Sequence, residues 1–202
     1  MSLCRKLVFA AGSLALAALL LASMPRAFNS REAAAEEKEK KEKPKPNYVG
    51  ATKCGLCHND PKAGDQLGQW KKSKHAKAYQ SLATAKAKEI AGKAGIKDPQ
   101  KDLKCTKCHV TGIEEPARSK KLKPADGVQC ETCHGAGEFY AKNEVFNQGR
   151  KVAIEHGLVI PDEKLCTHCH NKESPTFPGE FNFKEMWKKV NHPDPRKKEE
   201  GK

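Results

Sequence analysis

The amino-acid sequence predicts a mainly α-helical fold of short helices and long loops, and three observations support this class. Residues 64–93 are rich in Ala and Lys, which favour helix. Pro and Gly interrupt other segments, notably 95–104 and 110–129, which we expect to be loops. Only 37% of the 202 residues are hydrophobic and only 6% are aromatic, which is too little for an ordinary core of this size.

A five-residue pattern, Cys-x-x-Cys-His, occurs four times in the chain. We call each copy a pentad. The pattern is the attachment signal for haem c, in which two thiols form thioethers with one porphyrin and the adjacent histidine binds the iron. The cysteines expected to attach four haems c are Cys54, Cys57, Cys105, Cys108, Cys130, Cys133, Cys166 and Cys169. The proximal iron ligands are then His58, His109, His134 and His170.

Zinc binding and dithiol redox chemistry are the alternative interpretations of paired cysteines. Zinc sites with two such pairs usually separate them by about 15–20 residues. The pairs here begin at residues 54, 105, 130 and 166, so none is spaced in that way, and each pair is followed by histidine. Four haems explain both facts. They would also provide the missing apolar interior, so we expect that the polypeptide does not fold without them.

Four histidines remain for the opposite, distal faces of the irons. His75 lies on the apolar face of the expected helix over 64–93 and is predicted to be a distal ligand. His192 is a second distal candidate. It follows an expected helix from Phe183 to Asn191, which a capping box starting at Asn182 begins.

His156 is the third distal candidate, at the end of a weaker helix expected over 143–157. The alternative for His156 is a helix-terminal histidine bonded to backbone carbonyls. His168 lies within the fourth pentad, on a short helix expected over 162–171, and is expected to point away from its own iron. Three distal histidines for four irons leave one five-coordinate haem, which could bind a small ligand such as nitric oxide.

The formal net charge is +13, which raises the question of nucleic-acid binding. Each haem adds two propionates, so much of the lysine excess is balanced by the cofactor. The chain also lacks the alternation of aromatic and basic residues that is typical of single-strand binders. We therefore expect no nucleic-acid partner, and the charge remains compatible with an acidic redox partner.

The chain divides into four parts. Residues 1–27 are expected to be a signal peptide or membrane anchor, because Arg5 and Lys6 precede an apolar run over residues 7–24. Residues 28–47 are a charged, disordered linker, and 48–193 form the tetrahaem domain. Residues 194–202 are a charged tail. This organisation predicts export to the periplasm, with anchoring to the inner membrane through residues 7–24 as the alternative.

Four stretches resemble the tetrahaem cytochrome c-554 family. They are YVGATKC at 48–54, WKKSKHAKAY at 70–79, GVQCETCHGAG at 127–137 and FKEMWKKVNH at 183–192. The resemblance implies four closely stacked haems, with His75 and His192 as distal ligands. It also implies an open iron on the second haem, held by Cys105, Cys108 and His109. The family carries a further histidine soon after its third pentad, where Lys142 and Asn143 stand here, so His156 is our substitute for the first haem.

The resemblance further implies a periplasmic electron carrier rather than an enzyme. Its partners would be a donor oxidoreductase and an acceptor, either another cytochrome or a quinone-linked membrane complex of a respiratory chain. One alternative is a small reductase that acts on nitric oxide or a similar ligand at a five-coordinate haem. The other is a subunit of an extracellular cytochrome filament.

Overall fold

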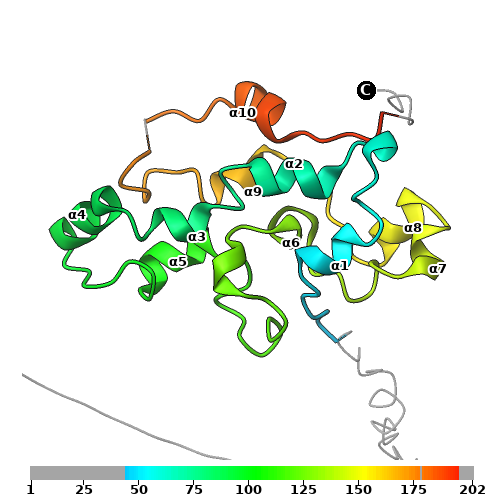
Figure 1. The fold of residues 1–202 in the computed structure, drawn as a ribbon, viewed down its shortest axis with the longest axis horizontal. Coiled ribbons are helices and arrows are strands. Elements are labelled where there is room, and N and C mark those ends of the chain that lie inside the picture. Colours follow the sequence, from blue (N-terminus) through cyan, green and yellow to red (C-terminus); the bar gives the residue numbers. More distant parts are fainter. Residues whose placement is uncertain (1–43, 178, 196–202) are drawn as a thin grey trace, which may run out of the picture. The chain divides into compact units, whose positions relative to one another are not determined.

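The computed structural model describes residues 44–177 and 179–195. Within this part the chain forms ten short α-helices and two 3-10 turns and contains no β-strand, which confirms the mainly α class (Figure 1). The helices are α1 (Ala51–Gly55), α2 (Gln66–Lys72), α3 (Ala78–Ser81), α4 (Ala85–Lys93), α5 (Leu103–His109), α6 (Cys130–His134), α7 (Asn143–Phe146), α8 (Arg150–Glu155), α9 (Glu163–Thr167) and α10 (Phe183–Val190). The 3-10 turns are η1 (Pro61–Ala63) and η2 (Pro124–Asp126).

Polar side chains fix the first residues of several helices. Asn182 Oδ1 accepts a hydrogen bond from Glu185 N at 3.1 Å, so the helix predicted from the capping box begins where expected. Asp102 and Asp162 accept equivalent bonds at the start of α5 and α9, which carry residues of the second and fourth pentads. Local capping therefore places these two attachment motifs on helices.

The helical region expected over 64–93 is divided into α2, α3 and α4. The chain is extended at Ser73 (φ −73°, ψ 163°), and a new helix begins only at Ala78. The reason is a long-range contact, because the carbonyl oxygen of His75 accepts a hydrogen bond from Val128 N at 3.0 Å. His75 therefore lies in the link between two helices rather than on the face of one long helix.

The helix expected over 143–157 is also divided, into α7 and α8, which pack against each other. The break contains Gly149, whose φ of 88° lies in the region that favours glycine. His156 is the residue at which α8 ends, as the sequence predicted for its position in the chain.

The buried apolar residues of the described chain are few and mostly small. They are Ala51, Ala63, Leu82, Ala91, Val110, Val128, Ala136 and Val145. Four of these eight are alanines, so their side chains remove little apolar surface from water. A porphyrin interior, as predicted from the composition, fits a polypeptide with so small a core of its own.

The folded part begins slightly before Tyr48. Asn47 N donates to Glu138 Oε2 at 2.7 Å, and Arg118 Nε donates to the Pro46 carbonyl at 2.7 Å. The expected signal segment, most of the expected linker and most of the charged tail lie outside the described residues. Within the described part, no helix has the length and apolar character needed to cross a membrane.

Candidate haem-binding site

Two predicted distal histidines lie opposite predicted proximal histidines. The rings of His75 and His170 have their centroids 6.1 Å apart, and the rings of His134 and His192 show the same separation. Two imidazoles that share one metal through bonds of about 2 Å have centroids roughly 6 Å apart. The geometry therefore fits an iron between each pair, in the fourth and third haems respectively.

The hydrogen bonds of these histidines also suit iron binding. Nδ1 of His109 lies 2.8 Å from the Ala78 carbonyl oxygen, and Nδ1 of His134 lies 3.1 Å from that of Val159. His192 Nδ1 lies 2.7 Å from the oxygen of Val190. An Nδ1–H group that donates to a carbonyl leaves Nε2 as the lone-pair donor for a metal.

Burial favours the same neutral form in three of the four paired rings. Desolvation is the main cause that lowers the pKa of His75, His134 and His170 below the ordinary value for histidine. A neutral imidazole is the form that ligates a metal. The lowered pKa therefore favours the ligating form of His75, His134 and His170.

The backbone of residues 127–128 holds His75 in place. Trp70 Nε1 donates to the Val128 carbonyl at 2.8 Å, while Val128 N donates to the carbonyl of His75. Gly127 has φ +66°, and a Cβ atom there would lie 2.7 Å from the carbonyl oxygen of His75. Only glycine allows so close an approach of the two backbones.

The third pentad holds the first through a buried carboxylate. Glu131, only 2% exposed, accepts hydrogen bonds from Val49 N, Gly50 N and Gly137 N at 2.7–2.8 Å. Gln129 Oε1 accepts from Ala51 N at 2.8 Å. Helix α1, which carries Cys54, thus has the donors at its start satisfied by residues about 80 positions later.

Gln129 also carries an unusual amide. Its Nε2 atom is buried and has no hydrogen-bond partner among the described residues. Buried amide groups are nearly always hydrogen-bonded, because an unpaired donor is costly. A donor beside Cys130 suits an acceptor on the cofactor, such as a haem propionate.

Contacts between cysteines link the pentads in a definite order. The thiols of Cys54 and Cys130 lie close enough to interact, which joins the first pentad to the third and raises the pKa of Cys54. The thiols of Cys108 and Cys169 lie close enough to interact, which joins the second pentad to the fourth and raises the pKa of Cys169. Cys133 interacts electrostatically with Cys169, which joins the third to the fourth. The spatial order of the pentads is therefore first, third, fourth, second.

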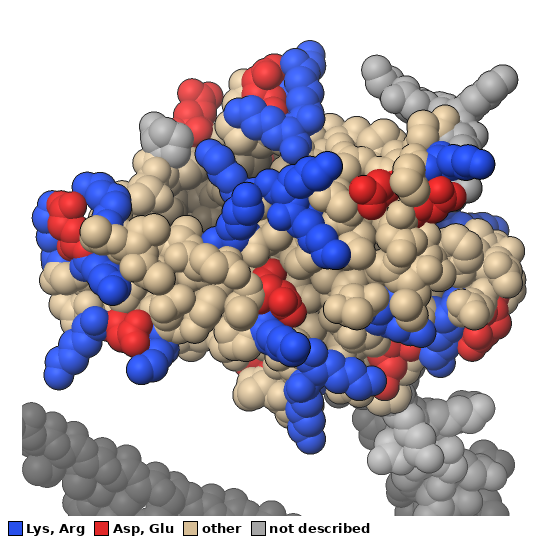
Figure 2. Space-filling model, viewed as in Figure 1, with Lys and Arg blue, Asp and Glu red and all other residues tan. Residues whose placement is uncertain are grey.

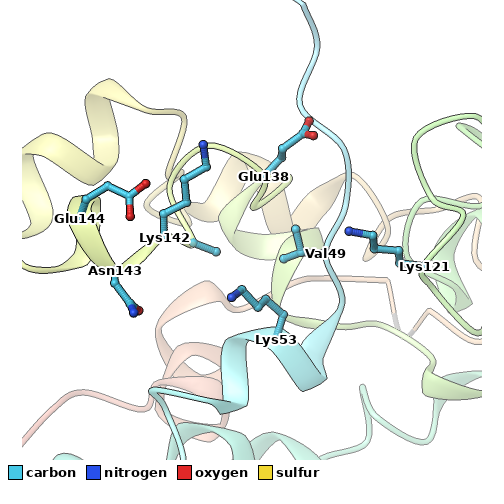
Figure 3. A pocket seen from close by; sticks show the side chains of 8 residues that line it. Val49, Lys53, Lys121, Glu138, Lys142, Asn143 and Glu144 are labelled. Carbon is cyan, nitrogen blue, oxygen red and sulfur yellow. The ribbon is translucent and has the colours of Figure 1, made fainter.

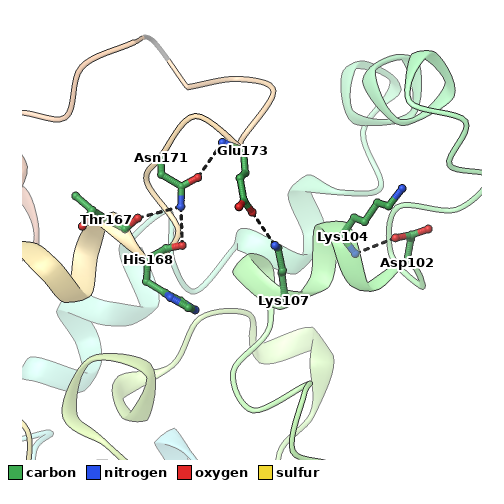
Figure 4. A network of polar contacts seen from close by, with 7 residues as sticks. All are labelled: Asp102, Lys104, Lys107, Thr167, His168, Asn171 and Glu173. Carbon is green, nitrogen blue, oxygen red and sulfur yellow. Dashed lines mark hydrogen bonds and ion pairs between the residues drawn. The ribbon is translucent and has the colours of Figure 1, made fainter. Parts of the chain in front are cut away.

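A polar network supports the contact between the second and fourth pentads (Figure 4). Lys107 Nζ, within the second pentad, lies 2.8 Å from Glu173 Oε2, just after the fourth. Asn171 positions this segment, because its side chain donates to the carbonyl of His168 at 2.8 Å and accepts from Glu173 N at 2.9 Å. His168 is exposed and lies at the end of α9.

The first pentad has a different neighbour. The ring of Phe146 lies opposite His58, with centroids 6.1 Å apart and an angle of 82° between the planes. His156, our candidate for this position, is exposed and has Nδ1 2.9 Å from the Val152 carbonyl of its own helix. Its role as a ligand of the first haem stays a prediction. Phe146 was missed by the sequence analysis, although it follows closely the positions where the related family has a histidine.

A cavity of about 360 Å³ lies beside α1 and near the first pentad (Figure 3). Lys53, Lys121 and Lys142 line it together with Glu138 and Glu144. Lys53 directly precedes Cys54 in the sequence. The excess of ammonium groups makes this wall suitable for an anionic group.

Known proteins resemble the chain in sequence and in structure. Residues 53–135 match the family described as cytochrome c554 and c-prime, and residues 97–180 match cytochrome c3. Cytochrome c-554 of Nitrosomonas europaea is 31% identical over 149 residues, which cover 65% of this chain and 61% of that relative. The chain thus spans about three fifths of the length of this curated relative.

The fold comparison agrees with the sequence comparison. The solved structure of reduced cytochrome c554 from Nitrosomonas europaea matches with a TM-score of 0.53 at 29% identity. The match covers 75% of this chain and 86% of that one. The four pentads, the paired histidines and both comparisons lead to one conclusion: the chain is similar to the cytochrome c554 family of multihaem c-type cytochromes.

Proposed function

We propose that this protein is a periplasmic tetrahaem electron carrier that shuttles electrons between redox partners of a respiratory chain. The observation that carries the proposal is the pair of histidine couples, His75 with His170 and His134 with His192, each with ring centroids 6.1 Å apart. An iron with two imidazole ligands has no free position for a substrate. Such an iron exchanges electrons and does not bind reactants.

The bound haems supply one-electron redox chemistry, and the polypeptide sets their spacing. The eight pentad cysteines would hold them, with His58, His109, His134 and His170 as proximal ligands. The order first, third, fourth, second supports a continuous path, because electron transfer slows steeply as the distance between cofactors grows. The buried Glu131 carboxylate keeps the first and third attachment helices together along this path.

The surface supports an acidic partner. Lysines gather on one face over α2 and α10 (Figure 2). The last turn of α2 carries Lys71 and Lys72, and the last turn of α10 carries Lys188 and Lys189. A basic face attracts a partner with an acidic docking surface and accelerates their encounter. The donor oxidoreductase and the acceptor, a cytochrome or a quinone-linked membrane complex, would each present such a surface.

Purified protein from an export-competent host would test the proposal. The intact mass should exceed that of the polypeptide by four haems, and the haem absorption bands should shift reversibly on reduction and reoxidation. Cell fractionation should place the protein in the periplasm or on the outer side of the inner membrane. A colourless product, or haems that cannot be reduced by an external donor, would refute the proposal.

A further inference from the structure

We propose that the first haem is five-coordinate, with Phe146 covering its distal face, and that its iron binds small uncharged diatomic molecules such as carbon monoxide or nitric oxide. This inference rests on the proposed attachment of a haem at Cys54, Cys57 and His58. It adds a ligand site to a protein otherwise assigned to electron transfer.

The geometry carries the inference because it repeats at three pentads with one change of residue. The ring opposite His58 lies at the same 6.1 Å separation as the rings opposite His134 and His170. At those two pentads the opposite ring is an imidazole, with a nitrogen that can bind iron. At the first pentad it is the phenyl ring of Phe146, which has no lone pair to donate.

Phe146 is held in this position by its own helix. It is the last residue of α7, where its N–H donates to the Lys142 carbonyl at 2.9 Å and its carbonyl accepts from Gly149 N at 3.2 Å. The preceding residue, Val145, is 3% exposed and anchors the helix in the interior. The Phe146 side chain is directed elsewhere, with 53% of the residue exposed on the polypeptide. An exposed aromatic ring that faces a proximal histidine is well placed to pack against a porphyrin.

The two remaining histidines are accounted for elsewhere. His156 ends α8, where its Nδ1 atom satisfies the Val152 carbonyl at 2.9 Å. This contact leaves Nε2 free, as it does in His134 and His192. The place of His156 argues against it as a ligand, because it lies exposed at the end of α8 and the ring beside His58 is that of Phe146. His168 follows α9 inside the fourth pentad and is exposed. Opposite His58, the structure places Phe146 instead of either histidine.

The chemistry of the distal side selects the class of ligand. A phenyl ring cannot donate a hydrogen bond to a bound anion or hold a water molecule on the iron. Neutral diatomic molecules need no such bond. At 6.1 Å from His58 the phenyl ring itself fills the sixth position, so a diatomic ligand enters when this exposed side chain turns aside. The open iron expected at the second haem, on the family resemblance, would bind such molecules as well.

Titration of the reduced tetrahaem protein with carbon monoxide tests the inference. The wild type should bind two molecules per chain, at the first and second haems. Phe146→His, which supplies an imidazole, should bind one molecule fewer, and one high-spin signal should be lost from the electron paramagnetic resonance spectrum of the oxidised protein. Phe146→Leu is the matched control and should keep the stoichiometry of the wild type.

His156→Ala separates the inference from the competing assignment. If His156 were the distal ligand of the first haem, this variant would bind one more carbon monoxide than the wild type. We expect no change. An increase in His156→Ala, or equal stoichiometry in Phe146→His and wild type, would overturn the inference. Should Phe146→His fail to mature, the His156→Ala result and the wild-type count still decide. Four haem additions in the mass spectrum confirm the cofactors independently of these results.

Discussion

Replacement of Glu131 by glutamine is predicted to destabilise the protein by several kcal/mol. Glu131 Oε1 accepts from both Val49 N and Gly137 N, and Oε2 accepts from Gly50 N. The glutamine side chain can keep its oxygen toward the first two donors, but its NH₂ group then faces Gly50 N. The charge-assisted hydrogen bond from Gly50 N is then lost, and two donors, Gly50 N and the glutamine NH₂ group, face each other at a position that is only 2% exposed.

The magnitude follows from these three bonds. A buried donor left without a partner costs about 1–3 kcal/mol. The two remaining bonds change from charged to neutral acceptors, which weakens each by about 1 kcal/mol. The sum, roughly 3–5 kcal/mol, is a large part of the 5–15 kcal/mol that typically separates folded from unfolded domains.

Urea unfolding of the purified haem protein, followed by far-UV circular dichroism, measures this loss. Glu144→Gln is the matched control, because Glu144 is exposed, and its midpoint should equal that of the wild type. A Glu131→Gln midpoint equal to the control would show that the carboxylate does not hold α1 to the third pentad. The role assigned to the buried Glu131 carboxylate would then be wrong.

Three further predictions concern the histidine couples. Gly127→Ala should force the His75 backbone away, because the new Cβ would lie 2.7 Å from the His75 carbonyl oxygen. The low-spin signal in the electron paramagnetic resonance spectrum should then decrease. Gly92→Ala, with open space around its Cβ, is the control and should leave the spectrum unchanged. His75→Ala and His192→Ala should each convert one low-spin haem to high spin, and an unaltered spectrum would exclude that residue as a ligand. Burial lowers the pKa of His134, so protons bind the unfolded form preferentially. The contribution of His134 to the stability of the folded state should be complete above a pH of about 6.5 and should decline on acidification. The decline should be visible as a loss of low-spin haem absorbance. A rise in low-spin absorbance towards low pH would contradict this prediction.

Local patterns explain what the sequence could predict. The pentads are contiguous, and the attachment chemistry depends on their spacing alone. The start of α10 depends on Asn182 and Glu185, three residues apart, so the capping box was sufficient to predict it. The couples of His75 and His192 with proximal rings agree with the distal positions predicted for them, although their binding of iron stays a prediction.

Long-range contacts explain what the sequence could not predict. The break near His75 arises from its bond to Val128, a residue more than 50 positions away. The buried cluster around Glu131 was equally hidden, because a carboxylate inside a pentad resembles any surface acid until its donors are known. Phe146 gave no signal of its own, since helical propensity and spacing say nothing about which ring will face His58.

The central claim is that haem, attached covalently at four places, forms the interior of this protein. The intact mass of the exported, denatured chain tests this claim most directly, because thioether-linked haem stays bound after unfolding. We predict a mass equal to the processed polypeptide plus four haems. A mass that matches the polypeptide alone, or the polypeptide with fewer haems, would contradict the account.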